Sequence, residues 1–274
     1  MIRKIVVPVD GSAASERIIS HVAELRRAVD AGVHLVHVTG SELLAQMKGR
    51  DYLRSLENRA KGVLPIDSSA LRTGEPAFEI LKYAVVERAE LMAFTTRGAS
   101  LVRRVLFGST AIELLRSSQV PLLVARPEWP VRPLRRILAA IDASKASRGA
   151  IAVTAELARG TGAEIVLTRI LVEGESRESV EASLERSAAA LAAEGVRVDA
   201  RLGSGDPARG ILDAARETRS DLIALGTHGR RGTDRFFFGS VAESVLLGSE
   251  VPMLLRRAAR VPRFPRSLTY GART

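Results

Sequence analysis

The sequence of 274 residues contains no cysteine, and this absence excludes several kinds of chemistry. Without thiols the chain can form no disulfide, thiolate metal site or iron–sulfur cluster, and it has no cysteine nucleophile. Long apolar runs are missing too, since no segment approaches the roughly 18 apolar residues that a membrane-spanning helix needs. The first strand-like run, 5–9, is too short for the apolar core of a signal peptide. We therefore expect a cytoplasmic protein.

Aromatic residues are scarce, at 4% of the chain, and no basic stretch is interleaved with them as a base-stacking surface requires. The formal net charge is nevertheless +10. Four arginines, Arg260, Arg263, Arg266 and Arg273, lie in segment 258–274, which has no acidic residue and is interpreted as a basic tail. This composition indicates a basic cytosolic protein with a basic tail and argues against a nucleic-acid binder, and phosphate-bearing small ligands would also suit the charge.

The strongest signal is an internal repeat with a spacing of 131 or 132 residues. The matching pairs are 3–12 with 135–144, 74–77 with 205–208, Gly108-Ser109 with Gly239-Ser240, and Val120-Pro121 with Val251-Pro252. Because this period is far too long for a solenoid, the repeat indicates two copies of one domain. Prolines at 127, 130 and 133 cannot continue a strand or helix. We predict domains at 1–126 and 135–257, joined by a linker at 127–134.

Each copy alternates short apolar strands with helical patterns. In the second copy we predict strands at 137–141, 165–172, 196–202, 221–225 and 252–256, and helices at 145–159, 178–193, 207–218 and 240–247. Ser144 is the expected N-cap of the first helix, and Gly195 the glycine that ends the second. This order predicts an α/β fold with a doubly wound, mostly parallel sheet in each copy. Ligands of such sheets bind beyond the carboxyl ends of the strands, where the strand order reverses.

A glycine-rich loop follows the fourth strand of the second copy. Gly226 and Gly229 are followed, after nine residues, by Gly239-Ser240 at a helix start. Glycines permit positive φ and let main-chain N–H groups approach a phosphate, while a helix N-terminus adds the positive end of its dipole. Asp142, at the end of the first strand, could accept hydrogen bonds from a ribose or base. The loop matches neither the Walker A nor the dinucleotide fingerprint, and the alternative that these glycines only punctuate a loop stays open.

Together with the Gly-Asp-Pro-Ala stretch and the Val-Pro strand, these residues resemble the universal stress protein family in its tandem, ATP-binding form. The resemblance implies two flavodoxin-like, five-stranded sheets whose last strands, 120–125 and 251–256, pair antiparallel, so that the copies form a pseudo-dimer within one chain. It also implies ATP as the ligand of the second copy, with Mg²⁺ or Mn²⁺ bound through the nucleotide and not by protein side chains. The residues carried over are Ala140, Ile141, Asp142, Ile170, Leu225, Gly226, His228, Gly229, Gly239, Ser240, Val241 and Ala242.

The first copy departs from the pattern, because Thr95 stands where the leading glycine would be. A β-branched residue resists positive φ and adds bulk against a phosphate, so we expect weaker binding or none there. If Thr95 has an ordinary strand conformation, binding survives. The residues left for this weaker site are Val9, Asp10, Val38, Gly98, Gly108 and Ser109.

The predicted function is an ATP-binding regulatory module of a stress response, without a committed catalytic residue. A slow ATPase or autophosphorylating enzyme, and a scaffold for protein partners with a vestigial loop, stay open as alternatives. His34 and His37 are three residues apart on a strand and therefore point to opposite faces, which argues against a joint metal site. The sequence identifies no protein partner, and a homodimer of the tandem chain also stays open.

Overall fold

The computed structural model describes residues 2–96, 103–142, 144–227 and 239–257, and the predicted basic tail lies outside them. The first copy contains β1 (Lys4–Val9), α1 (Ala13–Glu16), α2 (Ile18–Arg26), β2 (Gly32–Thr39), α3 (Leu43–Ala60), β3 (Ser68–Thr73), α4 (Pro76–Val86), β4 (Leu91–Thr95), α5 (Arg103–Ser117) and β5 (Leu122–Ala125). The second contains β6 (Arg136–Ala140), α6 (Lys145–Thr161), β7 (Glu164–Leu171), α7 (Arg177–Ala193), β8 (Arg197–Ser204), α8 (Pro207–Glu217), β9 (Leu222–Thr227), α9 (Ser240–Gly248) and β10 (Met253–Arg257).

The strands of both copies form one continuous sheet in the order β3-β2-β1-β4-β5-β10-β9-β6-β7-β8. Within each half, neighbouring strands are parallel, as the alternation of strands and helices predicts. The order reverses between β1 and β4, and between β6 and β9, whereas flavodoxin itself has the order 2-1-3-4-5. The doubly wound architecture is confirmed, and these two reversal points are where a ligand is expected.

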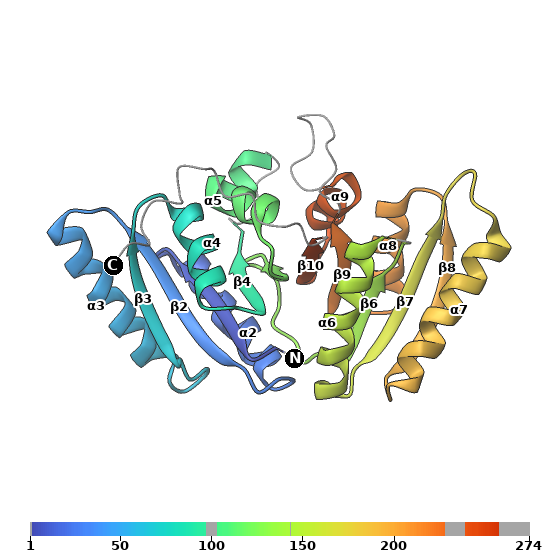
Figure 1. Ribbon diagram of the computed structural model, residues 1–274, viewed down its shortest axis with the longest axis horizontal. Coiled ribbons are helices and arrows are strands. Elements are labelled where there is room, and N and C mark those ends of the chain that lie inside the picture. Colours follow the sequence, from blue (N-terminus) through green and yellow to red (C-terminus); the bar gives the residue numbers. More distant parts are fainter. Residues whose placement is uncertain (1, 97–102, 143, 228–238, 258–274) are drawn as a thin grey trace, which may run out of the picture.

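The two halves join through their last strands. β5 and β10 pair antiparallel, with Leu123 opposite Leu254, so the predicted pseudo-dimer within one chain is confirmed. Both residues have no exposed surface. Figure 1 shows β10 at the centre of the molecule, with α3 and α7 at its two ends. The pairing buries two strand edges that would otherwise be open to other chains.

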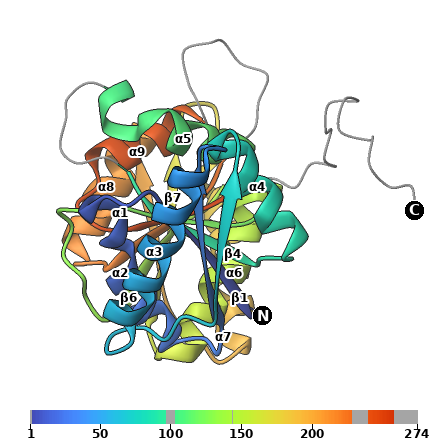
Figure 2. The same ribbon diagram turned by 90° about the vertical axis from the view of Figure 1, so that its left-hand side faces the viewer.

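Local signals in the sequence place the helix ends where the structure has them. The hydroxyl of Ser144 accepts from the Ser147 N–H at the start of α6, Gly195 follows α7 with φ 78°, and Pro207 opens α8. Helices cover both faces of the sheet (Figures 1 and 2), which is why central strands such as β1 and β9 are almost wholly buried. Within the described ranges, no helix is both long and apolar enough to cross a membrane.

The copies also touch away from the sheet. In the linker, Trp129 is 4% exposed, and the carbonyl of Pro127 accepts from Arg17 Nε at 3.2 Å. Gly160 of α6 lies so close to the first copy that a Cβ there would stand 1.6 Å from the Ala28 carbonyl oxygen. The linker and α6 therefore hold the two copies in one fixed arrangement.

Candidate functional site

The reversal point of the second copy gathers the residues that follow β6 and β9. Ala140 lies opposite Leu225 in the parallel pair, and the chain continues from β6 through Ile141 to the exposed Asp142. The Ile141 N–H donates to the Thr168 carbonyl at 2.8 Å, which keeps this segment against β7. The structure therefore brings together five predicted site residues: Ala140, Ile141, Asp142, Leu225 and Gly226.

A hydrogen-bonded turn fixes the Asp142 loop. Asp142 Oδ1 accepts from the Ser144 N–H at 2.9 Å, and the Asp142 N–H donates to Ser147 Oγ at 3.1 Å. In the first copy Asp10 Oδ1 accepts from both the N–H and the hydroxyl of Ser12, at 2.9 and 2.6 Å. Burial raises the pKa of Asp10, but the hydrogen bonds from Ser12 and Ser15 outweigh it and leave the pKa below its usual value. Asp10 is therefore an anion at neutral pH.

The helix that follows β9 begins on a glycine with an unusual backbone. Gly239 has φ 122°, and Ser240 stands exposed at the first position of α9. In the part of the chain that the structure describes, no side chain of the N-cap position caps this helix, whose start carries the positive end of the dipole. Gly108, with φ 69°, lies inside α5, where it kinks the helix just before the exposed Ser109. The predicted positive φ is confirmed at Gly239, and Gly108 has one as well.

Gly226 has a different role from the one we predicted. Its backbone lies in β9 without a positive φ, so the interpretation that it supplies an unusual backbone conformation is wrong. A Cβ at Gly226 would stand 2.3 Å from the Ser147 nitrogen and 2.5 Å from the Ala146 carbonyl carbon. The glycine therefore lets the first turn of α6 sit directly on β9, next to the Asp142 loop.

Thr95 occupies the equivalent position in the first copy, and it has an ordinary strand conformation at the end of β4. The condition under which we expected binding in the first copy to survive is therefore met, and binding itself stays a prediction. Its hydroxyl donates to the Ala14 carbonyl at 2.8 Å, a group that would accept from the Ile18 N–H in an unbroken helix. The helical hydrogen-bond pattern is interrupted at Arg17, between α1 and α2, although the Arg17 backbone stays helical with φ −57° and ψ −24°, whereas α6 is a single helix of 17 residues. The copies thus differ in how the first helix meets the fourth strand.

The predicted site residue at the end of β7 has a buried side chain. Ile170 is 6% exposed, and its Cδ1 is the neighbour that a Cβ at Gly203 or Gly210 would meet, at 2.8 and 2.7 Å. Its side chain therefore fills the contact with β8 and α8, and Val38 is half-buried at the matching position. In α9, Val241 is half-buried and Ala242 is 3% exposed. His228, Gly229 and Gly98 lie outside the described residues.

Sequence reasoning missed one polar contact at this edge. Arg169 Nη1 donates to the Ile141 carbonyl at 3.3 Å and its other terminal nitrogen pairs with Glu175. In the first copy His37 Nδ1 lies 2.8 Å from the Val9 carbonyl. His37 and Arg169 occupy the same position of the repeat, 132 residues apart, and this correspondence is the signal that could have shown the contact.

Comparison with known proteins decides the family. The model of the universal stress protein family matches residues 1–126 and again 133–257. The chain belongs to the universal stress protein family, with two of its domains in tandem. The two matched ranges agree with the structure, since each spans one five-stranded half of the sheet.

Relatives of this universal stress protein occur in both single and tandem lengths. A universal stress protein of Mycobacterium tuberculosis is 25% identical over 291 residues, covering 92% of this chain and 96% of the relative. One of Thermus aquaticus is 35% identical over 135 residues, which is 45% of this chain and 98% of the relative. The crystal structure of a universal stress protein from Archaeoglobus fulgidus superposes with a TM-score of 0.78 at 24% identity, covering 93% and 96% of the two chains. That likeness supports the fold.

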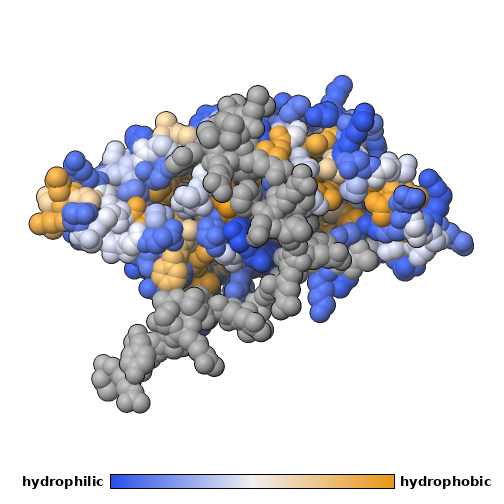
Figure 3. Space-filling model, turned by 90° about the horizontal axis from the view of Figure 1, so that it is seen from above, coloured by the Kyte–Doolittle hydropathy of each residue, from blue (hydrophilic) through white to orange (hydrophobic). Residues whose placement is uncertain are grey.

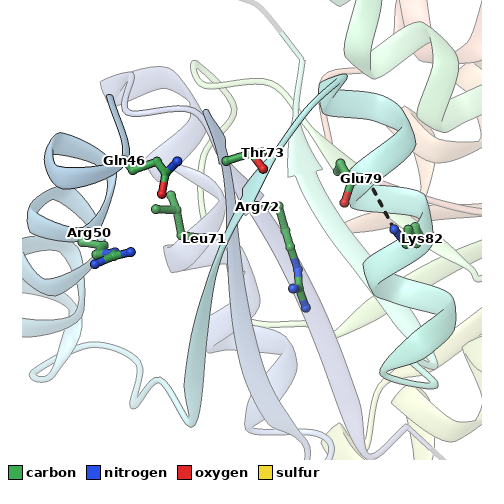
Figure 4. A pocket seen from close by; sticks show the side chains of 7 residues that line it. All are labelled: Gln46, Arg50, Leu71, Arg72, Thr73, Glu79 and Lys82. Carbon is green, nitrogen blue, oxygen red and sulfur yellow. Dashed lines mark ion pairs between the residues drawn. The ribbon is translucent and has the colours of Figure 1, made fainter. Parts of the chain in front are cut away.

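A separate cleft lies at the outer edge of the first domain. It has a volume of about 510 Å³ and is lined by Gln46, Arg50, Leu71, Arg72, Thr73, Glu79 and Lys82 from α3, β3 and α4. Figure 4 shows Gln46 and Arg50 on the α3 side, while Arg72 extends along α4, where its guanidinium lies 5.1 Å from the Tyr83 ring centroid. None of the predicted site residues lines this cleft.

An apolar patch marks the same end of the molecule. Viewed from above in Figure 3, it lies at the left, where α3 begins. Its residues Leu43, Leu44 and Met47 are 74%, 63% and 53% exposed. The patch is remote from β6 and β9 in the strand order, so it is no part of the Asp142 site.

Proposed function

We propose that the second domain binds ATP and that the chain is a nucleotide-dependent regulatory module of a stress response. The observation that carries the proposal is the pairing of two features beside one reversal point. Asp142 is exposed at the end of β6, and the neighbouring strand β9 leads to α9, which opens on Gly239 with φ 122°. A carboxylate suits ribose hydroxyls, and an uncapped helix start suits phosphate.

Each part of the nucleotide has a counterpart in this arrangement. Ala140 and Ile141 would flank the base with their main chain, beside the backbone of Ile170 and Leu225, and Asp142 would accept from the ribose. The amides of Gly239, Ser240, Val241 and Ala242, with the Ser240 hydroxyl, would hold the phosphates. Ala242 can contribute only its amide, because its side chain is buried. His228 and Gly229 would complete the phosphate loop, and Mg²⁺ or Mn²⁺ would be held by the phosphates.

For the first domain we propose a weaker site built from Val9, Asp10, Val38, Gly98, Gly108 and Ser109. Asp10 keeps the same turn as Asp142, and Gly108 keeps a positive φ before Ser109. The difference lies in the helix that carries the turn, whose hydrogen bonding is interrupted at Arg17 where the Ala14 carbonyl accepts from the Thr95 hydroxyl. Asp10 Oδ1 also accepts from the Ser12 hydroxyl, which would leave less of this carboxylate for a ribose.

Isothermal titration with Mg-ATP tests the proposal, using variants that are matched between the domains. We expect Asp142→Ala and Ser240→Ala each to weaken the tighter binding event by about 1–3 kcal/mol, the cost of losing hydrogen bonds to a charged or buried partner. The matched variants Asp10→Ala and Ser109→Ala should leave that event unchanged. The proposal fails if the wild type binds no nucleotide, or if all four variants give the same heats as the wild type.

A further inference from the structure

An arginine from the first domain reaches across to the phosphate-binding helix of the second. Arg126 follows β5 directly, and its Nη2 donates to the carbonyls of Leu246 and Leu247, at 2.7 Å each. These two carbonyls belong to the last turn of α9, which ends at Gly248. One nitrogen of Arg126 thus binds two residues that lie 120 and 121 positions later in the sequence.

The linker holds this guanidinium in place. It lies 5.1 Å from the ring centroid of Trp129, which is 4% exposed, and the Trp129 N–H donates to the Arg126 carbonyl at 3.1 Å. Burial lowers the pKa of Arg126, but a guanidinium remains charged at neutral pH. A stacked, half-buried arginine of this kind has little freedom to move, so it acts as a fixed anchor for the helix end.

The other end of α9 is the phosphate end of the proposed site. The helix has nine residues and is therefore only about 13 Å long. Its last carbonyls have no partner within the helix and carry the negative end of the dipole, which an arginine complements. Because so short a helix moves as one body, an anchor at Leu246 and Leu247 also fixes where the amides of Ser240 and Val241 stand.

We propose that Arg126 is a positioning residue for nucleotide binding in the second domain, so that the first domain and the linker set the phosphate affinity of a site they do not touch. This inference rests on the proposed function for its effect on ATP. A second arginine at the interface, Arg256, has a different kind of partner, since its Nη1 donates to the carbonyl of Gln119, a loop residue beyond the end of α5. Arg256 is thus an interface arginine that does not hold α9, and it supplies the matched control.

The first measurement compares ligands with and without phosphate on the full chain. In Arg126→Ala the dissociation constant for Mg-ATP should rise about 3- to 30-fold, the range seen when residues away from a ligand alter its binding. Binding of radiolabelled adenosine, which meets the Asp142 end alone, should stay as in the wild type. Arg256→Ala should leave both affinities unchanged. Equal weakening of ATP binding in both variants, or equal loss for ATP and adenosine, would mean a general loosening of the chain and would overturn the proposal.

The second measurement does not depend on nucleotide. Hydrogen–deuterium exchange of the α9 amides should be faster in Arg126→Ala than in the wild type, and unchanged in Arg256→Ala. If the wild type binds no ATP, the proposed function has failed, and the exchange rates still decide whether Arg126 anchors α9. Unchanged exchange in α9 of Arg126→Ala overturns the anchoring itself.

Discussion

Gly226 and Ser147 approach each other so closely that a Cβ on the glycine would stand 2.3 Å from the serine nitrogen. The contact joins β9 to the first turn of α6 main chain to main chain. Ser147 in turn accepts from the Asp142 N–H, so the loop that presents the carboxylate rests on this contact. The glycine supports the proposed ribose end of the site through packing.

We therefore expect Gly226→Ala to displace the start of α6. Overpacking against backbone, which cannot rotate away, costs about 1–3 kcal/mol of unfolding free energy. ATP affinity should fall as well, because the Asp142 turn moves with α6. Urea unfolding followed by circular dichroism, and titration with Mg-ATP, give the two quantities.

Gly203→Ala is the matched control, since it is also a strand glycine. Its added Cβ would meet Ile170 Cδ1 at 2.8 Å, the far end of a side chain that can shift. Its cost in stability should be smaller and ATP binding should persist. If the two alanine variants behave alike, the backbone contact at Ser147 has no special importance.

Thr95→Gly should raise the affinity of the first domain for Mg-ATP, whereas Gly226→Ala should lower that of the second. Without the Thr95 hydroxyl, the Ala14 carbonyl is released to the Ile18 N–H, and α1 and α2 can join into one helix like α6. The Asp10 turn would then rest on a continuous helix, as the Asp142 turn does, at a cost of about 0.5–1 kcal/mol for a glycine in a strand. In an Asp142→Ala background, titration should show tighter binding of Mg-ATP than the same background with Thr95.

Thr95→Ser provides the control for this gain, because serine keeps a hydroxyl that can reach Ala14. We expect no increase in affinity from it. An equal gain from serine and glycine would show that the methyl group of Thr95, and not its hydrogen bond, is what separates the two domains.

Local features were predictable from sequence because their causes are local. Ser144 caps α6 through a residue three positions on, and Gly195 ends α7 by its own φ, so short patterns identify both. The antiparallel pairing of Leu123 with Leu254 followed from the family resemblance, which supplied the long-range information.

The roles of residues that depend on neighbours distant in the sequence could not be predicted from short patterns. A glycine such as Gly226 can be required by its φ or by lack of space, and only Ser147, 79 positions earlier, decides between them. Arg126 is one of many arginines in the sequence, and its partner Leu246 comes near only because β5 and β10 are paired. The same holds for His37 and Arg169, whose carbonyl partners are the last residue of β1 and the residue after β6.

Docking of the two domains should depend on Gly160. Alanine there gains about 1 kcal/mol in helix propensity, but its Cβ would stand 1.6 Å from the Ala28 carbonyl oxygen. Because that neighbour is main chain of the first domain, the added Cβ would push the two domains apart. The free-energy cost of this separation exceeds the gain in helix propensity, so Gly160→Ala should lower the unfolding free energy. Gly149→Ala on the same helix would meet only the movable Arg256 Cγ at 3.0 Å, and should be neutral or stabilising. Denaturant unfolding of both variants checks the expected difference in sign.

Acid should destabilise the first domain through His21. This residue of α2 is 5% exposed, and its Nε2 has no hydrogen-bond partner among the described residues. Burial, and secondarily the Arg17 cation, lower its pKa from 6.5 to about 4. The unfolded chain therefore binds the proton first as pH falls, so the stability that neutral His21 supplies is complete above pH 6.5 and is lost between there and about pH 4. The loss corresponds to roughly 3 kcal/mol. In His21→Leu the fall in unfolding free energy between pH 7 and pH 4 should be smaller by about that amount, since the carboxylates titrate alike in both proteins. Equal slopes of stability against pH in the two proteins would show that His21 does not cause the acid sensitivity.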